Sequence, residues 1–234
     1  MYRIILDTET AGKVDNHSTL RVYDLGYKVV DSAFNTVISR DFVVGEIFYN
    51  NQLMDTAYYK NKLPQYKKEI AQGVRTVETF AYIRKQFIAD CKHYNVKQVW
   101  AFNASFDRDA LNATTNYLSN SILDEFMPHG VKWCDIAAPA CELICNRNKY
   151  FKFCIENDFV SNAGNCRTNA ETIYRYLKND INFVESHTGL KDAEIESEIL
   201  YACLKLKKKI NSEIVSCAWR IPQKKFKKFK NKNK

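Results

Sequence analysis

The stretch "RIILDTETAG", residues 3–12, decides how the chain is interpreted, because an apolar run ends there in two acidic residues. Residues 4–6 are aliphatic, as is typical of a buried strand, and Asp7 and Glu9 follow two positions apart. Side chains of a strand repeat their direction every second residue, so both carboxylates leave the same face. Two like charges held this close repel each other, which pushes one of them to bind a proton.

The composition is that of a globular protein with a basic end. The chain has 234 residues, of which 46% are apolar and 26% charged, enough for one domain with a sizeable core. Its formal charge is +8, but seven lysines and no acid stand in residues 224–234; without them, 28 basic residues face 27 acidic ones. Net charge therefore predicts no basic groove on the body. We expect a domain at residues 1–210 and a basic, disordered tail at residues 211–234.

The tail has two interpretations. Its lysines alternate with Phe226 and Phe229, and a solvated, disordered segment is the favoured one. The alternative is single-stranded nucleic-acid binding, with lysines on phosphates and phenylalanines on bases.

Targeting signals are not evident in the sequence. No basic segment leads into an apolar run near the first residue, and no run approaches the roughly 20 apolar residues that span a membrane. We therefore expect a cytoplasmic protein with no membrane partner. Its eight cysteines are expected to be reduced. Five of them are expected to pack as small buried hydrophobes, with zinc binding as the alternative: Cys134, Cys141, Cys145, Cys154 and Cys166.

Periodicity predicts an α/β layer protein, in which strands come first and then alternate with helices. Thr76 is the expected N-cap of the first long helix. Residues 146–167 are ambiguous. The expected strands cover residues 2–7, 20–31, 35–48, 96–103 and 132–136, the second and third being antiparallel, and the later helices begin near residues 105, 135, 169 and 190.

Three acidic motifs stand at strand ends or helix starts. Asp107 follows the strand at residues 96–103, and His187 precedes Asp192 by five positions. Each motif alone has an ordinary structural explanation, such as a carboxylate at the positive end of a helix. Asp107 and Asp192, together with Asp7 and Glu9 of the first motif, give four carboxylates at the places where α/β folds assemble sites. Such oxygen-rich clusters suit Mg²⁺ or Mn²⁺.

The motif order D-x-E, N-x-x-F-D-x-x-x-L and H-x-x-x-x-D-A resembles the DEDDh 3′–5′ exonucleases, a family that includes the proofreading subunit of the bacterial replicative polymerase and ribonuclease T. The resemblance covers residues 2 to about 205, and residues 171–200 are most similar to the bacteriophage branch. It implies a ribonuclease-H-like α/β fold, with a central mixed β-sheet flanked by helices. For a phage protein, the expected location is the host cytoplasm.

The resemblance also implies two divalent metal ions, Mg²⁺ or Mn²⁺, and a role for each matching residue. Asp7 would bridge both ions, and Glu9 and Asp192 would complete the first site. Asp107 would serve the second. His187 would be the general base that takes a proton from the attacking water, a role that suits the ordinary pKa of histidine.

The implied substrate is nucleic acid with a free 3′ end, DNA being favoured over RNA. Hydrolysis of the terminal phosphodiester would release nucleoside 5′-monophosphates from single-stranded or frayed ends, with Thr8, Thr10 and Phe106 near the last nucleotide. A proofreading role would need a polymerase in trans. The alternatives are an exoribonuclease or oligoribonuclease that uses the same site, and a non-catalytic nucleic-acid-binding module. The sequence after Gly12 departs from the family pattern, so the loop there is expected to differ.

Overall fold

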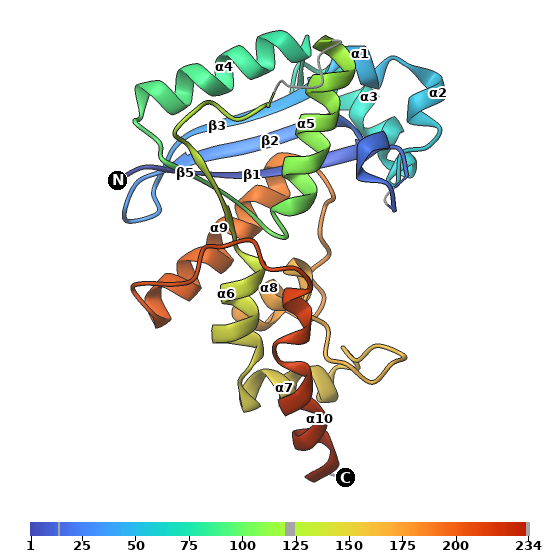
Figure 1. Cartoon of the computed structure of the whole chain (residues 1–234). Helices are drawn as coiled ribbons and strands as arrows, with labels where there is room; N and C mark the ends of the chain where they lie inside the picture. The colour runs from blue at the N-terminus through green and yellow to red at the C-terminus, as the bar shows by residue number, and fades with distance from the viewer. Residues whose placement is uncertain (14, 120–124, 233–234) are drawn as a thin grey trace. The chain divides into compact units, whose positions relative to one another are not determined.

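The computed structural model describes residues 1–13, 15–119 and 125–232. The chain divides into two compact units (Figure 1). The first consists of Met1–Trp100, Ser105–Trp133 and Ser186–Ala193, and the second of Ala101–Ala104, Cys134–Glu185 and Glu194–Lys234. The predicted boundary at residue 210 stays a prediction.

The chain begins with three long strands, continues with short strands between helices, and ends in helices. The strands are β1 (Arg3–Ala11), β2 (Arg21–Val30), β3 (Thr36–Val44), β4 (Thr76–Glu78), β5 (Gln98–Ala101) and β6 (Lys132–Asp135). The α-helices are α1 (Gly45–Phe48), α2 (Asn51–Met54), α3 (Leu63–Ala71), α4 (Phe80–His93), α5 (Ser105–Ser119), α6 (Ala137–Ala140), α7 (Asn148–Glu156), α8 (Ala170–Lys178), α9 (Gly189–Leu206) and α10 (Gln223–Lys232). Short 3₁₀ helices are η1 (His17–Thr19), η2 (Lys60–Lys62) and η4 (Ala218–Arg220), and η3 (Cys141–Cys145) is a π-helical turn.

The six strands form one mixed sheet in the order β4-β3-β2-β1-β5-β6. The first three strands of the chain form an antiparallel meander, whereas β5 joins β1, and β4 joins β3, in parallel. The α/β architecture and the antiparallel pairing of the second and third strands are therefore confirmed. Among the helices that the structure describes, none combines the length and apolar character that a membrane span requires.

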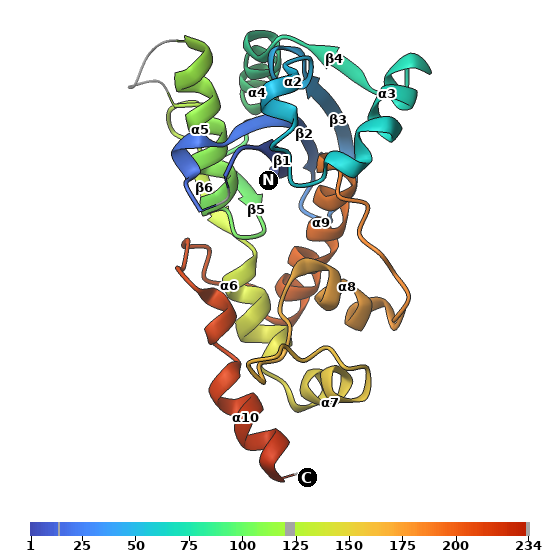
Figure 2. The ribbon, with the colours of Figure 1, turned by 90° about the vertical axis from the view of Figure 1, so that its right-hand side faces the viewer.

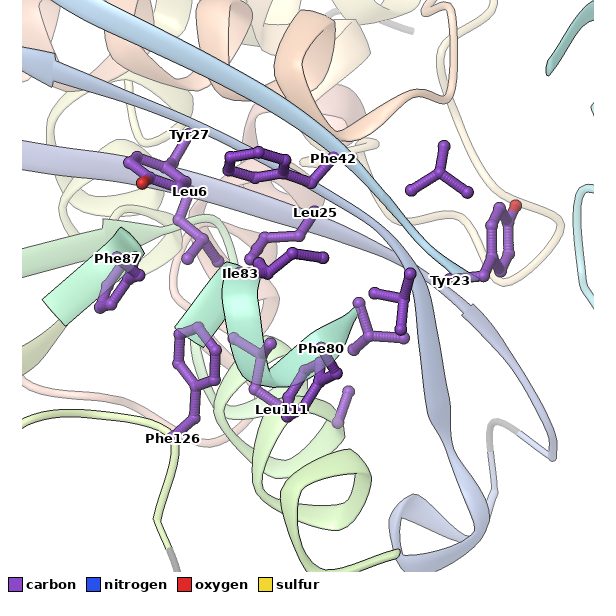
Figure 3. Packing of buried hydrophobic residues seen from close by; sticks show 14 of the residues in the cluster. Leu6, Tyr23, Leu25, Tyr27, Phe42, Phe80, Ile83, Phe87, Leu111 and Phe126 are labelled. Atoms are coloured by element: carbon purple, nitrogen blue, oxygen red, sulfur yellow. The ribbon is translucent and has the colours of Figure 1, made fainter. Parts of the chain in front are cut away.

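The core of the first unit lies between the meander and helices α4 and α5. Figure 3 shows Leu6 and Tyr27 of the strands facing Ile83 and Phe87 of α4. The Tyr27 and Phe87 rings meet edge to face, with their centroids 5.3 Å apart. Ile5 points to the other face of β1 and is also fully buried. Both faces of β1 are thus covered, which explains why its residues read as a continuous apolar run.

The expectation that Thr76 caps the first long helix is wrong. Residues 76–78 form strand β4 beside β3, and Thr79 is the N-cap of α4, its hydroxyl accepting a hydrogen bond from the Tyr82 N–H at 3.3 Å. Both threonines suit a cap by residue type. Pairing with β3 occupies the backbone around Thr76 and leaves Thr79 as the first residue free to start the helix.

The second unit is mostly helical and includes α6, α7, α8 and α10 (Figure 2). The ambiguous residues 146–167 contain α7 and an isolated bridge between Val160 and Cys166. The disordered tail is also a wrong expectation over its described part, because residues 223–232 form α10. Phe226, which is fully buried, gives this lysine-rich segment an apolar face to pack.

Candidate active site

The end of strand β1 carries two of the predicted site residues. Asp7 pairs with Gly26 of β2, and Glu9 pairs with Asp24. Because side chains alternate along a strand, both carboxylates leave the face opposite to that of Leu6. Asp7 is half-buried, whereas Glu9 is only 7% exposed. A carboxylate this deeply buried is costly unless a partner compensates its charge.

Two glycines allow the start of α9 to lie directly against β1 and β2. A Cβ atom on Gly26 would lie 1.8 Å from the backbone nitrogen of Leu190. A Cβ atom on Gly189 would lie 2.5 Å from the nitrogen of Gly26 and 2.9 Å from the carbonyl oxygen of Asp7. Since these neighbours are backbone atoms, any side chain would push the segments apart. Both positions therefore require glycine, and the resulting contact brings α9 to the acidic end of β1.

This contact brings together residues that are distant in the sequence. His187 has a left-handed backbone (φ 53°), and the Asp192 N–H donates to the Thr188 carbonyl at 3.0 Å in the first turn of α9. One potential ligand atom from each of Glu9, His187 and Asp192 lies within 4.8 Å of the other two. Glu9 and Asp192, the latter 5% exposed, are thus two buried carboxylates with an imidazole beside them.

Asp107 is linked to the same strand through a hydrogen bond. It lies in the first turn of α5, is 2% exposed, and accepts a hydrogen bond from the Thr8 hydroxyl at 2.8 Å. Thr8 stands between Asp7 and Glu9, so the start of α5 is tied to the acidic segment of β1. Asp7 and Asp107 themselves lie outside the group of three formed by Glu9, His187 and Asp192.

The remaining predicted residues also lie near this strand. Thr10 is 6% exposed and follows a β-bulge, since the pairing register shifts between Glu9 and Thr10. Phe106 is half-buried, packs on the core of the first unit, and meets the His17 ring edge to face at 5.7 Å. Core packing accounts for Phe106 without a substrate, and the nucleotide-contacting roles of Thr8, Thr10 and Phe106 stay predictions.

A buried polar network behind the site was not predicted from the sequence. Asp24 is fully buried and accepts hydrogen bonds from the Gly189 N–H at 3.0 Å, from a guanidinium nitrogen of Arg75 at 3.0 Å, and from the Tyr66 hydroxyl. Burial raises the pKa of Asp24, and the positive charge of Arg75 opposes that rise. Through Gly189, this carboxylate holds the segment that carries His187.

The signal for Asp24 is present in the sequence. It is the one charged residue within the apolar run at residues 22–27, which is unfavourable for a strand covered on both faces. Its partners Tyr66 and Arg75 come from a segment with no strong pattern. Their contact with Asp24 is tertiary, so the periodicity of the sequence does not predict it.

Tyr59 is a second unpredicted neighbour of the site. Its ring stacks on the imidazole of His187, with centroids 4.0 Å apart and an angle of 12° between the planes. Tyr58 meets the Tyr59 ring edge to face at 4.8 Å and is 72% exposed. The stack fixes the plane of the His187 ring, and Tyr58 extends the aromatic surface toward solvent.

Comparison with known proteins finds similarity in fold. No protein-family model and no curated protein sequence matches the chain. Structures of E. coli exonuclease I are similar to it. The complex with a dA16 oligonucleotide has a TM-score of 0.51 at 12% identity, over 88% of this chain and 41% of that one. For the dT13 complex the TM-score is 0.53 at 12% identity, over 88% and 42%.

A zinc-bound E. coli exonuclease I complex with single-stranded DNA is similar to the same extent, with a TM-score of 0.52 at 13% identity, over 89% of this chain and 41% of that one. The chain thus spans about two fifths of the length of these proteins. At this identity the similarity concerns the fold, and it confirms the predicted ribonuclease-H-like α/β class.

Proposed function

We propose that this protein is a metal-dependent 3′–5′ exonuclease that removes nucleotides from single-stranded or frayed DNA ends. The observation that carries the proposal is the group formed by Glu9, His187 and Asp192, whose potential ligand atoms lie within 4.8 Å of one another although Glu9 is distant from the other two in the sequence. Structural support alone does not require two buried carboxylates and an imidazole at one point. A metal-dependent site for phosphodiester hydrolysis accounts for this group, because carboxylates hold the ions and an imidazole can accept a proton.

The residues present fit divalent cations. Glu9 and Asp192 are buried beside each other, and their mutual repulsion favours a positive charge between them. Carboxylate oxygens are the ligands that Mg²⁺ and Mn²⁺ prefer. We assign one ion to Asp7, Glu9 and Asp192, and a second to Asp7 and Asp107. When bound, the ions supply positive charge at the scissile phosphate and lower the pKa of the attacking water.

His187 is the proposed general base. Its imidazole takes the proton of the water that attacks the terminal phosphorus. The bond from phosphorus to the 3′ oxygen of the preceding nucleotide breaks, and that oxygen takes up a proton from solvent to become a hydroxyl. Stacking on Tyr59 holds the ring in one plane, so the proton-accepting nitrogen keeps a constant direction. The products are a nucleoside 5′-monophosphate and a strand that is one nucleotide shorter.

DNA as the substrate is supported by the neighbours in fold, because the exonuclease I structures hold dA16 and dT13 oligonucleotides. We place Thr8, Thr10 and Phe106 at the terminal nucleotide. The zinc-bound form of that enzyme supports a divalent ion as the cofactor class.

The test is an end-labelled oligonucleotide incubated with the purified chain and Mg²⁺ or Mn²⁺. We expect stepwise shortening from the 3′ end, release of 5′-monophosphates, and protection by a 3′-terminal phosphorothioate linkage. Asp192→Asn is expected to abolish the reaction while leaving the fold intact, and Asp158→Asn, in the second unit, serves as the control.

Each contrary outcome indicates a different function for the protein. An intact oligonucleotide beside an active reference enzyme contradicts the proposal and leaves a non-catalytic binding module. Faster shortening of a matched RNA oligomer identifies an exoribonuclease that uses the same residues.

A further inference from the structure

Helix α10 of the second unit is amphipathic and firmly anchored. Phe226 is fully buried, and the Phe226 and Phe229 rings contact the Phe151 ring, with centroid distances of 5.4 and 5.6 Å. At the start of the helix, the Gln223 side chain accepts from the Cys166 N–H at 3.0 Å and donates to the Cys166 carbonyl at 3.1 Å. Phe226 is therefore committed to packing, and the alternative that both phenylalanines stack on bases is wrong.

The opposite side of α10 is a continuous row of lysines. We call it the lysine face and define it by four exposed side chains, Lys224, Lys227, Lys228 and Lys232. Lys224 lies three residues before Lys227 and four before Lys228, and Lys228 lies four before Lys232, so these side chains are neighbours on the helix and repel one another. No acidic residue occurs in the sequence after Glu213. Within the described part of the chain, none of the four lysines forms an ion pair, so their charge is available to an external polyanion.

An exposed aromatic ring precedes the lysine face by about one helical turn. Trp219, in η4, is 45% exposed, and the guanidinium of Arg220 lies 5.2 Å from the centroid of its ring. The Trp219 carbonyl accepts a hydrogen bond from the Gln223 side chain at 2.8 Å, which fixes η4 to the start of α10. The ring and the lysine face are thus held together on one anchored segment.

Trp219 also lines two open cavities of the second unit, with volumes of about 410 and 400 Å³. Thr168 and Asn169 line both of them, and Arg167 lines the second. An indole ring beside hydroxyl, amide and guanidinium groups offers a nucleobase a stacking surface together with hydrogen-bond partners. Volumes of this size are typical of small-molecule sites.

We propose that Trp219 and the lysine face of α10 form a binding surface for single-stranded nucleic acid. Lysines contact the phosphates, and a base stacks on Trp219. The combination of a positive row and an exposed aromatic ring is the chemistry by which single strands are bound without regard to sequence. The inference rests on the proposed function, because the strand bound here is the substrate of the nuclease.

The test measures binding of a fluorescein-labelled oligothymidylate to the full chain by anisotropy, in EDTA, over a range of salt concentrations. Replacing Lys224, Lys227, Lys228 and Lys232 with Gln is expected to weaken binding at low salt by at least about tenfold. The slope of log K against log salt should fall by about 3, since a single strand loses about 0.7 counterion for each phosphate contact.

A matched control carries the same change of charge elsewhere. In this control, four exposed lysines of α3 and α4 are replaced with Gln: Lys67, Lys68, Lys85 and Lys92. The control variant should keep the affinity and the salt slope of the wild type. Trp219→Ala should lower affinity and abolish quenching of tryptophan fluorescence by the strand, with the slope retained, because stacking releases no counterions. Circular dichroism verifies that every variant is folded.

Two outcomes overturn the inference. One is equal affinity and slope for the α10 variant and its control. The other is preferential binding of an acidic peptide, such as polyglutamate, which would make the surface a protein-docking site. Hydrolysis of a dinucleotide by the wild-type chain tests the proposed function separately. A chain that binds strands through α10 and hydrolyses nothing contradicts the function and keeps the inference.

Discussion

His187 differs from the acidic residues around it because an imidazole exchanges its proton near neutral pH. In the structure it lies beside Glu9 and Asp192 and stacks on Tyr59. A carboxylate at this position would add repulsion to an acidic cluster, whereas a neutral imidazole does not. The residue is therefore suited to accept a proton without disturbing the binding of cations.

Replacing His187 with alanine separates proton transfer from cation binding. We expect kcat to fall about 10²–10⁴-fold, the usual contribution of a general base, while calorimetry shows Mn²⁺ affinity preserved. The base must be neutral, so wild-type kcat should decrease as acid protonates the imidazole, and the variant should lack this decrease. His129→Ala, at an exposed histidine, is the control. A variant that keeps the wild-type pH profile contradicts the assignment.

We expect Asp24 to affect the site only by holding the start of α9 in position. Asp24→Asn keeps the shape of the side chain but weakens the bonds to Arg75 and Gly189, so we expect a loss of about 1.5–3 kcal/mol in unfolding free energy. Mn²⁺ affinity should fall as well, because the start of α9 loosens.

A second buried acid provides the control for Asp24. Asp90→Asn removes a carboxylate that binds Arg40 and Tyr27 on the core side of the sheet. It should lower the unfolding free energy similarly and leave Mn²⁺ affinity unchanged. Equal effects of the two variants on Mn²⁺ affinity would refute a positioning role for Asp24.

At the scale of elements, periodicity predicted most strands and helices, because their apolar faces are regular. It failed where tertiary contacts decided the outcome. Residues 76–78 became a strand because β3 offered a free edge, and residues 223–232 became a helix because Phe151 offered a surface for Phe226. The contact between Gly26 and Gly189 depends on two segments distant in sequence, so no local pattern reveals it.

That glycine contact is testable by adding one methyl group. Gly189→Ala would place a Cβ atom 2.5 Å from the backbone of Gly26, so we expect α9 to shift, with a loss of about 1–3 kcal/mol or more in unfolding free energy. Mn²⁺ binding should weaken because Asp192 moves with the helix. At Gly45 the nearest atom is a side-chain carbon of Val77 at 3.3 Å, so Gly45→Ala should be tolerated. Equal tolerance of both changes would contradict the proposed close approach.

The contacts of β2, β3 and α3 with Arg75, which lies just before β4, predict a pH dependence of stability. Arg75 lies within 3.0 Å of carboxylate oxygens of Asp24, Asp41 and Glu69, so three acids share one guanidinium. Burial and the charge of Asp24 raise the pKa of Asp41 from 3.8 to about 7. The folded state then binds a proton that the unfolded chain has released, and unfolding free energy falls as pH rises from about 4 through 7.

Asp41→Asn should reduce this pH-dependent loss of unfolding free energy, as measured by urea unfolding below and above pH 7. Asp55→Asn, at an exposed residue, should leave it unchanged. If wild type and Asp41→Asn lose the same unfolding free energy over this range, Asp41 does not hold the proton.

At the scale of the whole molecule, the motifs predicted that Glu9, His187 and Asp192 lie together, but not how the chain brings them together. The order of the strands places β1 at the centre of the sheet, between β2 and β5, and β1 carries Asp7 and Glu9. The loop before α9 then supplies His187, and α9 supplies Asp192. Phage origin, a cytoplasmic location and a polymerase partner stay predictions of the sequence.

The central claim is that distant carboxylates form one cation site. Anomalous diffraction from a crystal soaked with Mn²⁺ and a nucleoside 5′-monophosphate tests it most directly. We expect two Mn²⁺ peaks, one coordinated by Glu9 and Asp192 and one beside Asp107, with Asp7 contacting both. Density for the nucleotide with no Mn²⁺ at these carboxylates, or Mn²⁺ bound only elsewhere on the chain, would contradict the account.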